Sequence, residues 1–544
     1  MITMKKIISY TCKSVKVNMV VGTIALIFLS ALMTLPMPVI QKYLVNALIA
    51  QDGKVITTLL IVMAVSIVMK IALSMASSFC SGVFEERASF NIRKNSITGL
   101  YDTDYTIIKA TNADYLHNRI KEDSTTISRF VGKVLNSFFS GLFILSFVVI
   151  YLFLFSPMLL VILAVVLALF LAVYFVCQSR MSKASSSFKE AQNTSYSVFN
   201  ESLANASTIK LHDWKAAELK KHDRVISNYI SAFRRTLKYS TMFVSVASSL
   251  QMIFVLSVFV VGSILILQDK LSVGDLVTLV SFASLVMAPI MSLMEIASVY
   301  PDAKVSYARL LQLHQLSKVT DGAVDIDHID SIDLHMDSYG YNSVSLITNF
   351  SYTFEKGKIY FLSGHNGAGK STLLNIISGL HSGYQGDIII NGQYCLKDVS
   401  RKTYYKHLTF VEQDTHLFSG TIRENIFYGC ADGSISAVPG YLSDFMSSLV
   451  NLPSGLDTAI VGNLSTTVSG GEKQKAALIR DLRQPGDIIL LDEPYSSLDK
   501  VSKRQLFEIL EGLKKDHIII IVAHGHEFDG FADDVVQVGA QKGA

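Results

Sequence analysis

Charged residues are scarce in this sequence, making up 17% of the 544 residues, against about a quarter in an ordinary soluble protein. Hydrophobic residues reach 50%, and the mean hydropathy is +0.38. Long apolar stretches crowd residues 1–300, whereas residues 331–544 have the composition of a soluble α/β domain. This shift excludes a single soluble domain and predicts two domains that face different solvents.

Cysteine is also scarce and shows no pairing pattern. The five cysteines are Cys12, Cys80, Cys177, Cys395 and Cys430. They lie far apart and form no C-x-x-C pair, so we expect reduced thiols rather than a disulfide framework or a zinc site. A formal net charge of +3 gives no reason to expect a nucleic acid or another special partner of one charge.

No small-residue cleavage site follows the basic residues Lys5 and Lys6 and the apolar run from Met19. More apolar runs come later, so this one is read as a first membrane helix rather than a signal peptide. A spanning helix needs roughly 20 apolar residues. Six stretches qualify: 18–40, 55–80, 134–155, 158–178, 241–267 and 273–300, the third and fourth joined by a tight turn at Ser156–Pro157.

Lysine and arginine are nearly missing from one set of connections between these spans, which carries only Lys42, Lys54 and Lys270. The long connections 85–130 and 180–240 are rich in both. Since basic loops stay on the cytoplasmic side, both long loops and both termini are predicted to be cytoplasmic.

The two long loops contain no runs of proline or glycine and mix charged with apolar residues at helical spacing. They are therefore predicted to be membrane helices that continue far into the cytoplasm. The single tryptophan, Trp214, lies in the second loop. It is either an aromatic packed at a helix–helix turn or a contact with the soluble domain.

Two ionisable residues, Lys70 and Glu295, fall within predicted spans. A charge at membrane depth is costly and usually faces a bundle interior or a wet cavity. We hypothesise that both line the substrate pathway and that Lys70 meets a polar or anionic part of the cargo. The alternative is a buried structural ion pair.

Residues 358–380 give an apolar strand, a glycine loop and a helix with one apolar face. Gly364, Gly369, Lys370 and Ser371 match the pattern G-x-x-x-x-G-K-[ST]. Such glycines let backbone N–H groups close on phosphate oxygens, the lysine reaches the β- and γ-phosphates, and the hydroxyl can hold Mg²⁺. The sequence therefore predicts a nucleotide phosphate site at the start of this helix.

Two further apolar strands end in ionisable residues. DIILLDEP carries Asp492 and Glu493, and HIIIIVAH ends at His524. In a parallel sheet the crevice lies at the carboxyl ends of the strands, so all three are expected beside the phosphate loop. Asp492 is suited to hold Mg²⁺ through water, and Glu493 to polarise the attacking water.

In this order the motifs resemble those of the ABC exporters of the half-transporter type. GHNGAGKST resembles the Walker A loop, DIILLDEP the Walker B strand, and SGGEKQ the family signature. Gln413 resembles the Q-loop glutamine, Asp499 the D-loop aspartate and His524 the switch histidine. Tyr341 lies where the family stacks an aromatic ring on adenine, with Tyr339 as the neighbouring alternative.

The resemblance extends over nearly the whole chain through NADYLHNRIKEDSTTI, NESLANASTIKLHDWKAAE and LSVGDLVTLVSFASLVMAPI. It implies a membrane all-α domain of six helices over 1–310, a linker over 311–330, and an α/β P-loop NTPase domain of the ABC type over 331–544. The turns of the two long loops would form coupling helices that dock on the nucleotide-binding domains.

The resemblance also implies a site for ATP and Mg²⁺. Glu493 and His524 would form the catalytic pair, and Ser371, Gln413 and Asp492 would surround the metal. The implied nucleotide contacts are Tyr341, Gly364, His365, Asn366, Gly367, Ala368, Gly369, Lys370, Ser371, Thr372, Gln413, Ser469, Gly470, Gly471, Glu472 and Asp499.

In this family the signature Ser469, Gly470 and Gly471 would cap the γ-phosphate held by the partner's Walker A loop, so each ATP is shared across a dimer. Glu472 stands where the family most often has glutamine. A carboxylate near the nucleotide should slightly weaken ATP-driven closure unless Lys473 or Lys475 offsets it. A homodimer is the simplest assembly, because one chain carries every motif; a heterodimer stays open.

The implied activity is ATP-driven export by alternating access, in a multi-pass protein of the bacterial inner membrane. The cargo is expected to be a peptide or another amphipathic molecule. A lipid or multidrug exporter or flippase, a siderophore-type importer and an ATP-gated membrane regulator stay open. A soluble DNA-repair ATPase built on the same nucleotide domain is excluded by the apolar spans.

Overall fold

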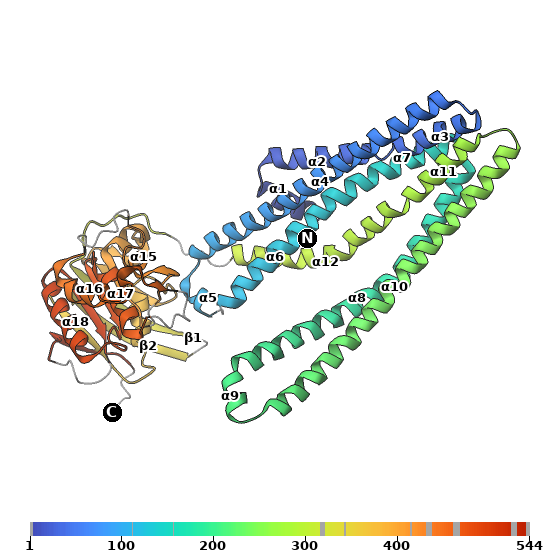
Figure 1. The fold of residues 1–544 in the computed structure, drawn as a ribbon. Coiled ribbons are helices and arrows are strands. Elements are labelled where there is room, and N and C mark those ends of the chain that lie inside the picture. The colour runs from blue at the N-terminus through green and yellow to red at the C-terminus, as the bar shows by residue number, and fades with distance from the viewer. Residues whose placement is uncertain are drawn as a thin grey trace. The chain divides into compact units, whose positions relative to one another are not determined.

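The computed structural model describes residues 4–110, 113–155, 157–315, 321–341, 344–413, 416–430, 438–460, 468–523 and 530–539. The chain divides into two compact units (Figure 1). The first comprises Met1–Gly99 and Asp114–His314, and the second comprises Leu100–Ala113 and Gln315–Ala544. The turn of the first long loop therefore belongs to the second unit, although the flanking helices belong to the first.

The first unit is entirely helical in its described residues. Its helices are α1 (Met4–Lys13), α2 (Val17–Leu32), α3 (Pro36–Ile49), α4 (Gly53–Tyr101), α6 (Ala113–Lys133), α7 (Phe139–Phe155), α8 (Pro157–Ala204), α9 (Ala206–Leu211), α10 (Lys215–Leu267), α11 (Val273–Leu285) and α12 (Met287–His314), with a π-helical turn over Val134–Phe138.

Within the described residues, six helical segments are long and apolar enough to cross a membrane, as the sequence predicts. They are Val17–Ile49, Gly53–Tyr101, Arg119–Leu154, Pro157–Ala204, Lys215–Leu267 and Val273–His314. Each is longer than its predicted apolar core, because the helices continue into the polar loops. The predicted helical character of these loops is confirmed: α8 and α10 run side by side through the second one (Figure 1).

The first and sixth spans are each broken where the sequence predicts a continuous helix. The first breaks before Pro36, which begins α3, and the sixth breaks at Val286, three residues before Pro289. Proline has no N–H for the preceding turn and restricts the residue before it, so a helix tends to restart there. The basic lead also differs from the prediction, because it forms a helix of its own, α1, with Ile7 and Thr11 buried.

The tip of the second loop is the short helix α9, followed by a turn at Trp214. The indole stacks on His212 with ring centroids 4.8 Å apart and is 54% exposed. The tryptophan therefore lies at the helix–helix turn, which is the position that the first of the two alternatives predicts. Its contact with a soluble domain remains a prediction.

The second unit contains two main sheets. The parallel sheet has the order β11-β3-β10-β9-β6, the antiparallel sheet has the order β2-β1-β4-β5, and β7 pairs with β8. The strands are β1 (Ser331–Tyr341), β2 (Val344–Glu355), β3 (Ile359–Ser363), β4 (Gln385–Ile390), β5 (Tyr394–Cys395), β6 (Leu408–Val411), β7 (Gly420–Thr421), β8 (Ala459–Ile460), β9 (Ile488–Asp492), β10 (Ile518–Val522) and β11 (Asp534–Gln537). The helices are α5 (Tyr105–Ala110), α13 (Lys370–Ile377), α14 (Arg401–Tyr404), α15 (Ile422–Ile426), α16 (Ser443–Val450), α17 (Gly470–Leu482) and α18 (Lys500–Leu513).

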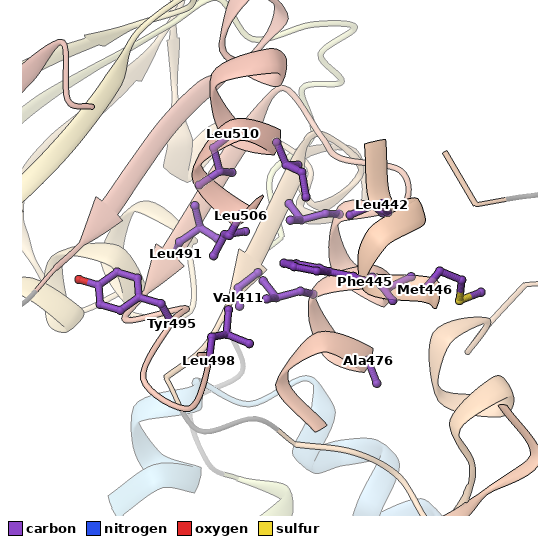
Figure 2. Close-up of a cluster of buried hydrophobic side chains, with 14 of the residues drawn as sticks. Val411, Leu442, Phe445, Met446, Ala476, Leu491, Tyr495, Leu498, Leu506 and Leu510 are labelled. Atoms are coloured by element: carbon purple, nitrogen blue, oxygen red, sulfur yellow. The ribbon is translucent and has the colours of Figure 1, made fainter. Parts of the chain in front are cut away.

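The core strands of the parallel sheet are buried on both faces, which explains their continuous apolar sequence. In β9, Ile489 and Leu491 face α16, α17 and α18, whereas Ile488 and Leu490 face α13 and the antiparallel sheet. Figure 2 shows the first of these clusters, in which Tyr495 and Leu498, just after β9, also pack. This packing fixes the segment that follows the carboxyl end of β9.

Candidate nucleotide site

The loop between β3 and α13 requires glycine at two positions for different reasons. A Cβ on Gly364 would come within 2.3 Å of the Val538 carbonyl oxygen, so the loop passes too close to β11's end for a side chain. Gly369 has φ +94°, in the left-handed region, and a Cβ there would lie 3.1 Å from Ile347 Cγ1. These constraints hold the loop in a tight turn against the start of α13.

Lys370 begins α13 and is 6% exposed. Its Nζ donates to the carbonyl oxygens of Gly364 at 2.8 Å and His365 at 3.2 Å. The ammonium therefore lies within the turn of the loop, where backbone N–H groups and a helix N-terminus favour an anion. The predicted phosphate-binding lysine is in position for that role.

A cavity of about 310 Å³ adjoins this loop. Most of its lining comes from one continuous stretch, and the remainder comes from three separate strand ends. The lining residues are Leu346, Asn366, Gly367, Ala368, Gly369, Lys370, Ser371, Thr372, Glu493 and Val522. The structure thus brings Glu493 to the phosphate loop across more than a hundred residues of sequence.

Glu493 leaves β9 with φ +46°, a region that non-glycine residues seldom occupy. Its backbone N–H donates to the Val522 carbonyl oxygen at 3.1 Å, which pins the turn to the end of β10. Backbone strain of this kind gathers at functional sites, where it aims a side chain. Here it aims the carboxylate of Glu493 toward the cavity of the phosphate loop.

Asp492 is the last residue of β9, is 6% exposed, and pairs in register with Val522 of β10. Ser371 lies on α13, which packs against β9. A buried carboxylate and a helix-borne hydroxyl are oxygen ligands of the kind that Mg²⁺ prefers, alongside phosphate oxygens and water. The two residues therefore fit the predicted metal. Gln413 lies exposed on the bend two residues after β6.

The SGGEKQ segment forms the start of α17, with Ser469 as its N-cap. The backbone N–H of Ser469 donates to Glu472 Oε2 at 2.6 Å, and the N–H of Glu472 donates to Ser469 Oγ at 3.3 Å. This reciprocal capping box satisfies two of the N–H groups that a helix start leaves open. The Glu472 carboxylate therefore has a structural task in its own helix.

Two family models match the chain. The one described as ABC transporter transmembrane region matches residues 20–290, and the one described as ABC transporter matches residues 347–496. Together they account for most of the sequence and for both units. The chain belongs to the ABC transporter family.

Curated relatives include exporters and flippases. The β-(1→2)glucan export ATP-binding/permease protein of Rhizobium meliloti is 25% identical over 64% of this chain and 60% of its own length. An ATP-dependent lipid A-core flippase of Syntrophus aciditrophicus is 35% identical over 38% of this chain and 34% of its own. The chain thus matches less than two thirds of the length of each.

A solved structure of a bacterial Atm1-family ABC exporter with ATP bound has a TM-score of 0.82 over 96% of this chain and 93% of that chain. The identity is 19%, so the match shows the shared fold. It agrees with the predicted fold class: an exporter-type domain of six apolar helices joined to an ABC-type ATPase domain.

Gln474 is a residue of this ABC domain that the sequence did not single out. Its side chain is 2% exposed; Nε2 donates to the Pro494 carbonyl oxygen at 2.6 Å, and Oε1 accepts from the Ser497 N–H at 2.9 Å. A Cβ on Gly471 would lie 2.9 Å from the Ser497 carbonyl oxygen. The signature helix is therefore joined directly to the segment that follows Glu493.

The D-loop aspartate, Asp499, caps α18 by accepting from the Ser502 N–H at 2.8 Å. This backbone hydrogen bond lowers the pKa of Asp499, so the carboxylate is ionised at neutral pH. Its contact with a nucleotide remains a prediction.

Two other predicted site residues, His524 and Tyr341, are wholly or partly outside the described residues. His524 lies outside the described residues. The backbone of Tyr341 ends β1, but its side chain is outside those described. The alternative, Tyr339, is 6% exposed and hydrogen-bonds through its hydroxyl to His381 Nδ1 at 3.1 Å.

The two membrane residues are placed on separate helices, Lys70 on α4 and Glu295 on α12. Lys70 is half-buried in the first unit. Glu295 forms an ion pair with Lys133, in which both side chains are well exposed. Their role in a substrate pathway remains a prediction.

Proposed function

We propose that the protein exports an amphipathic molecule across the bacterial inner membrane, driven by ATP hydrolysis at two sites shared between two copies of the chain. The observation that carries the proposal is that the phosphate loop and Glu493 line the same cavity. An acidic side chain at a phosphate site is suited to accept a proton from water rather than to bind the phosphate itself.

In the proposed reaction, the Glu493 carboxylate accepts a proton from a water molecule as the water oxygen attacks the γ-phosphorus. The bond from the γ-phosphorus to the bridging oxygen of ADP breaks, which leaves inorganic phosphate and ADP. Lys370 and the loop N–H groups hold the β- and γ-phosphate oxygens. Mg²⁺, when bound by Ser371, Gln413 and Asp492, would neutralise charge on these phosphates. His524 would hold the attacking water or the γ-phosphate.

Sharing of each ATP between two chains is supported by the arrangement of two helices. The phosphate-loop helix α13 packs on one face of the parallel sheet, and the signature helix α17 packs on the other. Their N-termini begin from opposite sides of the sheet, which argues against one chain enclosing one phosphate with both. A second copy would supply the missing signature to each phosphate loop, and a homodimer is the simplest such assembly.

The long helices support alternating access as the proposed transport mechanism. Helices α4, α8 and α10 have 49, 48 and 53 residues, far beyond the roughly 20 that cross a bilayer. Their cytoplasmic extensions would transmit closure of the nucleotide domains to the spans, with both termini cytoplasmic. The curated relatives export or flip glucans and lipids. The lipid A-core flippase favours an amphipathic cargo such as a lipid, and a peptide stays part of the proposal without support from these relatives.

The proposal is tested with Glu493→Gln in the full chain, reconstituted in lipid. This variant should bind ATP with the affinity of the wild type but lose at least a hundredfold in turnover, and ATP should stay trapped. Glu508→Gln is the matched control, because Glu508 is exposed on α18 in an ion pair with Arg504 at 3.0 Å. Sustained hydrolysis by Glu493→Gln would overturn the assignment of the base.

A further inference from the structure

The turn of the first long loop is bound to the ABC unit by a charged side chain. Asp104 accepts from the Thr106 N–H at 2.8 Å and from the Thr106 hydroxyl at 2.5 Å, and it also accepts from the Ser382 hydroxyl. Burial alone would raise the pKa of Asp104, but these hydrogen bonds outweigh it and lower the pKa. The carboxylate is therefore ionised at neutral pH and forms charge-assisted bonds.

His381, the residue immediately before Ser382, is 2% exposed and lies among aromatic rings. Its ring is stacked with that of Tyr105, centroids 6.5 Å apart at 29°, and with that of Tyr339, centroids 5.8 Å apart at 22°. Its Nδ1 is hydrogen-bonded to the Tyr339 hydroxyl at 3.1 Å. The imidazole thus contacts the loop turn on one side and strand β1 on the other.

Two routes of direct contact lead from His381 to the phosphate loop. The backbone N–H of His381 donates to the Asn375 carbonyl oxygen at 3.1 Å on α13, the helix that begins with Lys370. Across β1 and β2, Tyr339 pairs with Ile347, whose side chain lies 3.1 Å from where a Cβ on Gly369 would stand. A movement of the phosphate loop can therefore reach His381 along helix α13 and across the strand pair β1–β2.

The loop turn also approaches the segment that follows β6. Burial raises the pKa of Tyr105, and the nearby Glu412 carboxylate raises it further. Glu412 immediately precedes Gln413, the predicted metal and nucleotide contact. Tyr105 is consequently close to one of the segments that are expected to hold ATP.

We infer that His381 is a positioning residue that links the occupancy of the phosphate loop to the placement of the first-loop turn, Thr103–Ile107. This inference rests on the proposed function, since it concerns the step between ATP binding and the membrane helices. Burying an imidazole costs free energy unless its two nitrogens find hydrogen-bond partners, whereas an apolar side chain would fill the same space without that requirement. Chain connectivity then carries the movement of the turn into α4.

The test measures hydrogen exchange of the amides in Thr103–Ile107 of the full chain in nanodiscs, with and without ADP and vanadate. In the wild type, nucleotide trapping should slow exchange in this segment. In His381→Leu the nucleotide should bind within twofold of the wild-type affinity, while the change in exchange falls at least threefold. Tyr339→Phe, which removes only the hydroxyl, should give an intermediate loss.

His335→Leu is the matched control. His335 is on the same strand as Tyr339 but is exposed, with Ser351 Oγ at 3.4 Å from its Nδ1. It should respond to nucleotide like the wild type. If His381→Leu folds poorly, Tyr339→Phe and His381→Asn, which keeps a polar partner for the tyrosine, decide the question. An unchanged exchange response in these variants overturns the inference alone. Absence of ATP turnover in the wild type overturns the proposed function instead.

Discussion

Replacing Gln474 by leucine should destabilise the ABC unit and loosen the connection between the signature helix and the segment that carries Glu493. Leucine keeps most of the volume of glutamine but removes both hydrogen bonds, to the Pro494 carbonyl and from the Ser497 N–H. The Pro494 carbonyl would stay buried without its partner, whereas Ser497 is exposed, so its N–H can turn to water. An orphaned buried polar group costs about 1–3 kcal/mol, so the substitution should cost about 1–3 kcal/mol.

For a unit of this size, each kcal/mol shifts Tm by about 2–4 °C, so the predicted decrease is about 2–12 °C. The decrease is measured by scanning calorimetry of the full chain in detergent. The only tryptophan, Trp214, belongs to the first unit, so its fluorescence reports whether that unit is unaffected. At temperatures below the unfolding transition, ATP turnover should be at least tenfold lower than in the wild type, because Ser497 and Glu493 lie on the same short segment.

Gln505→Leu is the matched control, because the Gln505 amide donates to Asp444 at 3.2 Å on the exposed surface of α18. It should change stability by less than about 0.5 kcal/mol, as surface substitutions usually do. The reasoning is refuted if Gln474→Leu is as stable as Gln505→Leu and hydrolyses ATP at the wild-type rate.

Three further predictions concern the capping box, the loop anchor and the membrane lysine. Glu472→Gln keeps an acceptor for the Ser469 N–H and should leave Tm unchanged, whereas Glu472→Ala should cost about 0.5–2 kcal/mol in thermal unfolding. The pKa of Asp104 is lower in the folded chain than its unfolded value of about 3.9. The hydrogen bonds of its carboxylate therefore contribute fully to stability above that unfolded value, and this contribution is lost only as the pH falls through the lower folded pKa. Exchange of the Thr103–Ile107 amides, corrected for intrinsic rate, should therefore be constant between about pH 6 and 8, and Asp104→Asn should raise it throughout; a rise on acidification within that range would contradict this. Lys70→Ala should preserve membrane insertion and basal ATPase but weaken the stimulation of ATPase by cargo, and unchanged transport would remove Lys70 from the pathway.

The sequence was sufficient for features that depend on local pattern. The phosphate loop, with Lys370 in its turn, lies between a strand and a helix because the motif itself encodes that geometry. The six apolar spans follow from composition, and Glu493 could be placed at the crevice because strand ends gather there. The breaks before Pro36 and near Pro289 also had a signal in the sequence, since proline interrupts helices.

Features that depend on contacts between distant segments could not be predicted in this way. Gln474 ends the SGGEKQ motif, but only the tertiary fold shows that its amide bonds to the backbone of Pro494 and Ser497. His381 and Asp104 belong to no motif, and only the tertiary fold brings Tyr105 beside the imidazole. The capping box of Ser469 and Glu472 did have a signal in the sequence, because a serine followed three residues later by a glutamate is its recognisable pattern.

The central claim is that each ATP is held by the phosphate loop of one chain and the signature of its partner. It is tested by mixing Lys370→Ala chains with Gly471→Asp chains, dissociating and reassociating them, and measuring vanadate-dependent nucleotide trapping. Each variant alone should trap almost nothing. The account predicts that the mixture regains trapping, because a mixed dimer pairs one intact loop with one intact signature. If the mixture traps no more than the separate variants while mixed dimers are shown to form, each chain completes its own site and the claim is contradicted.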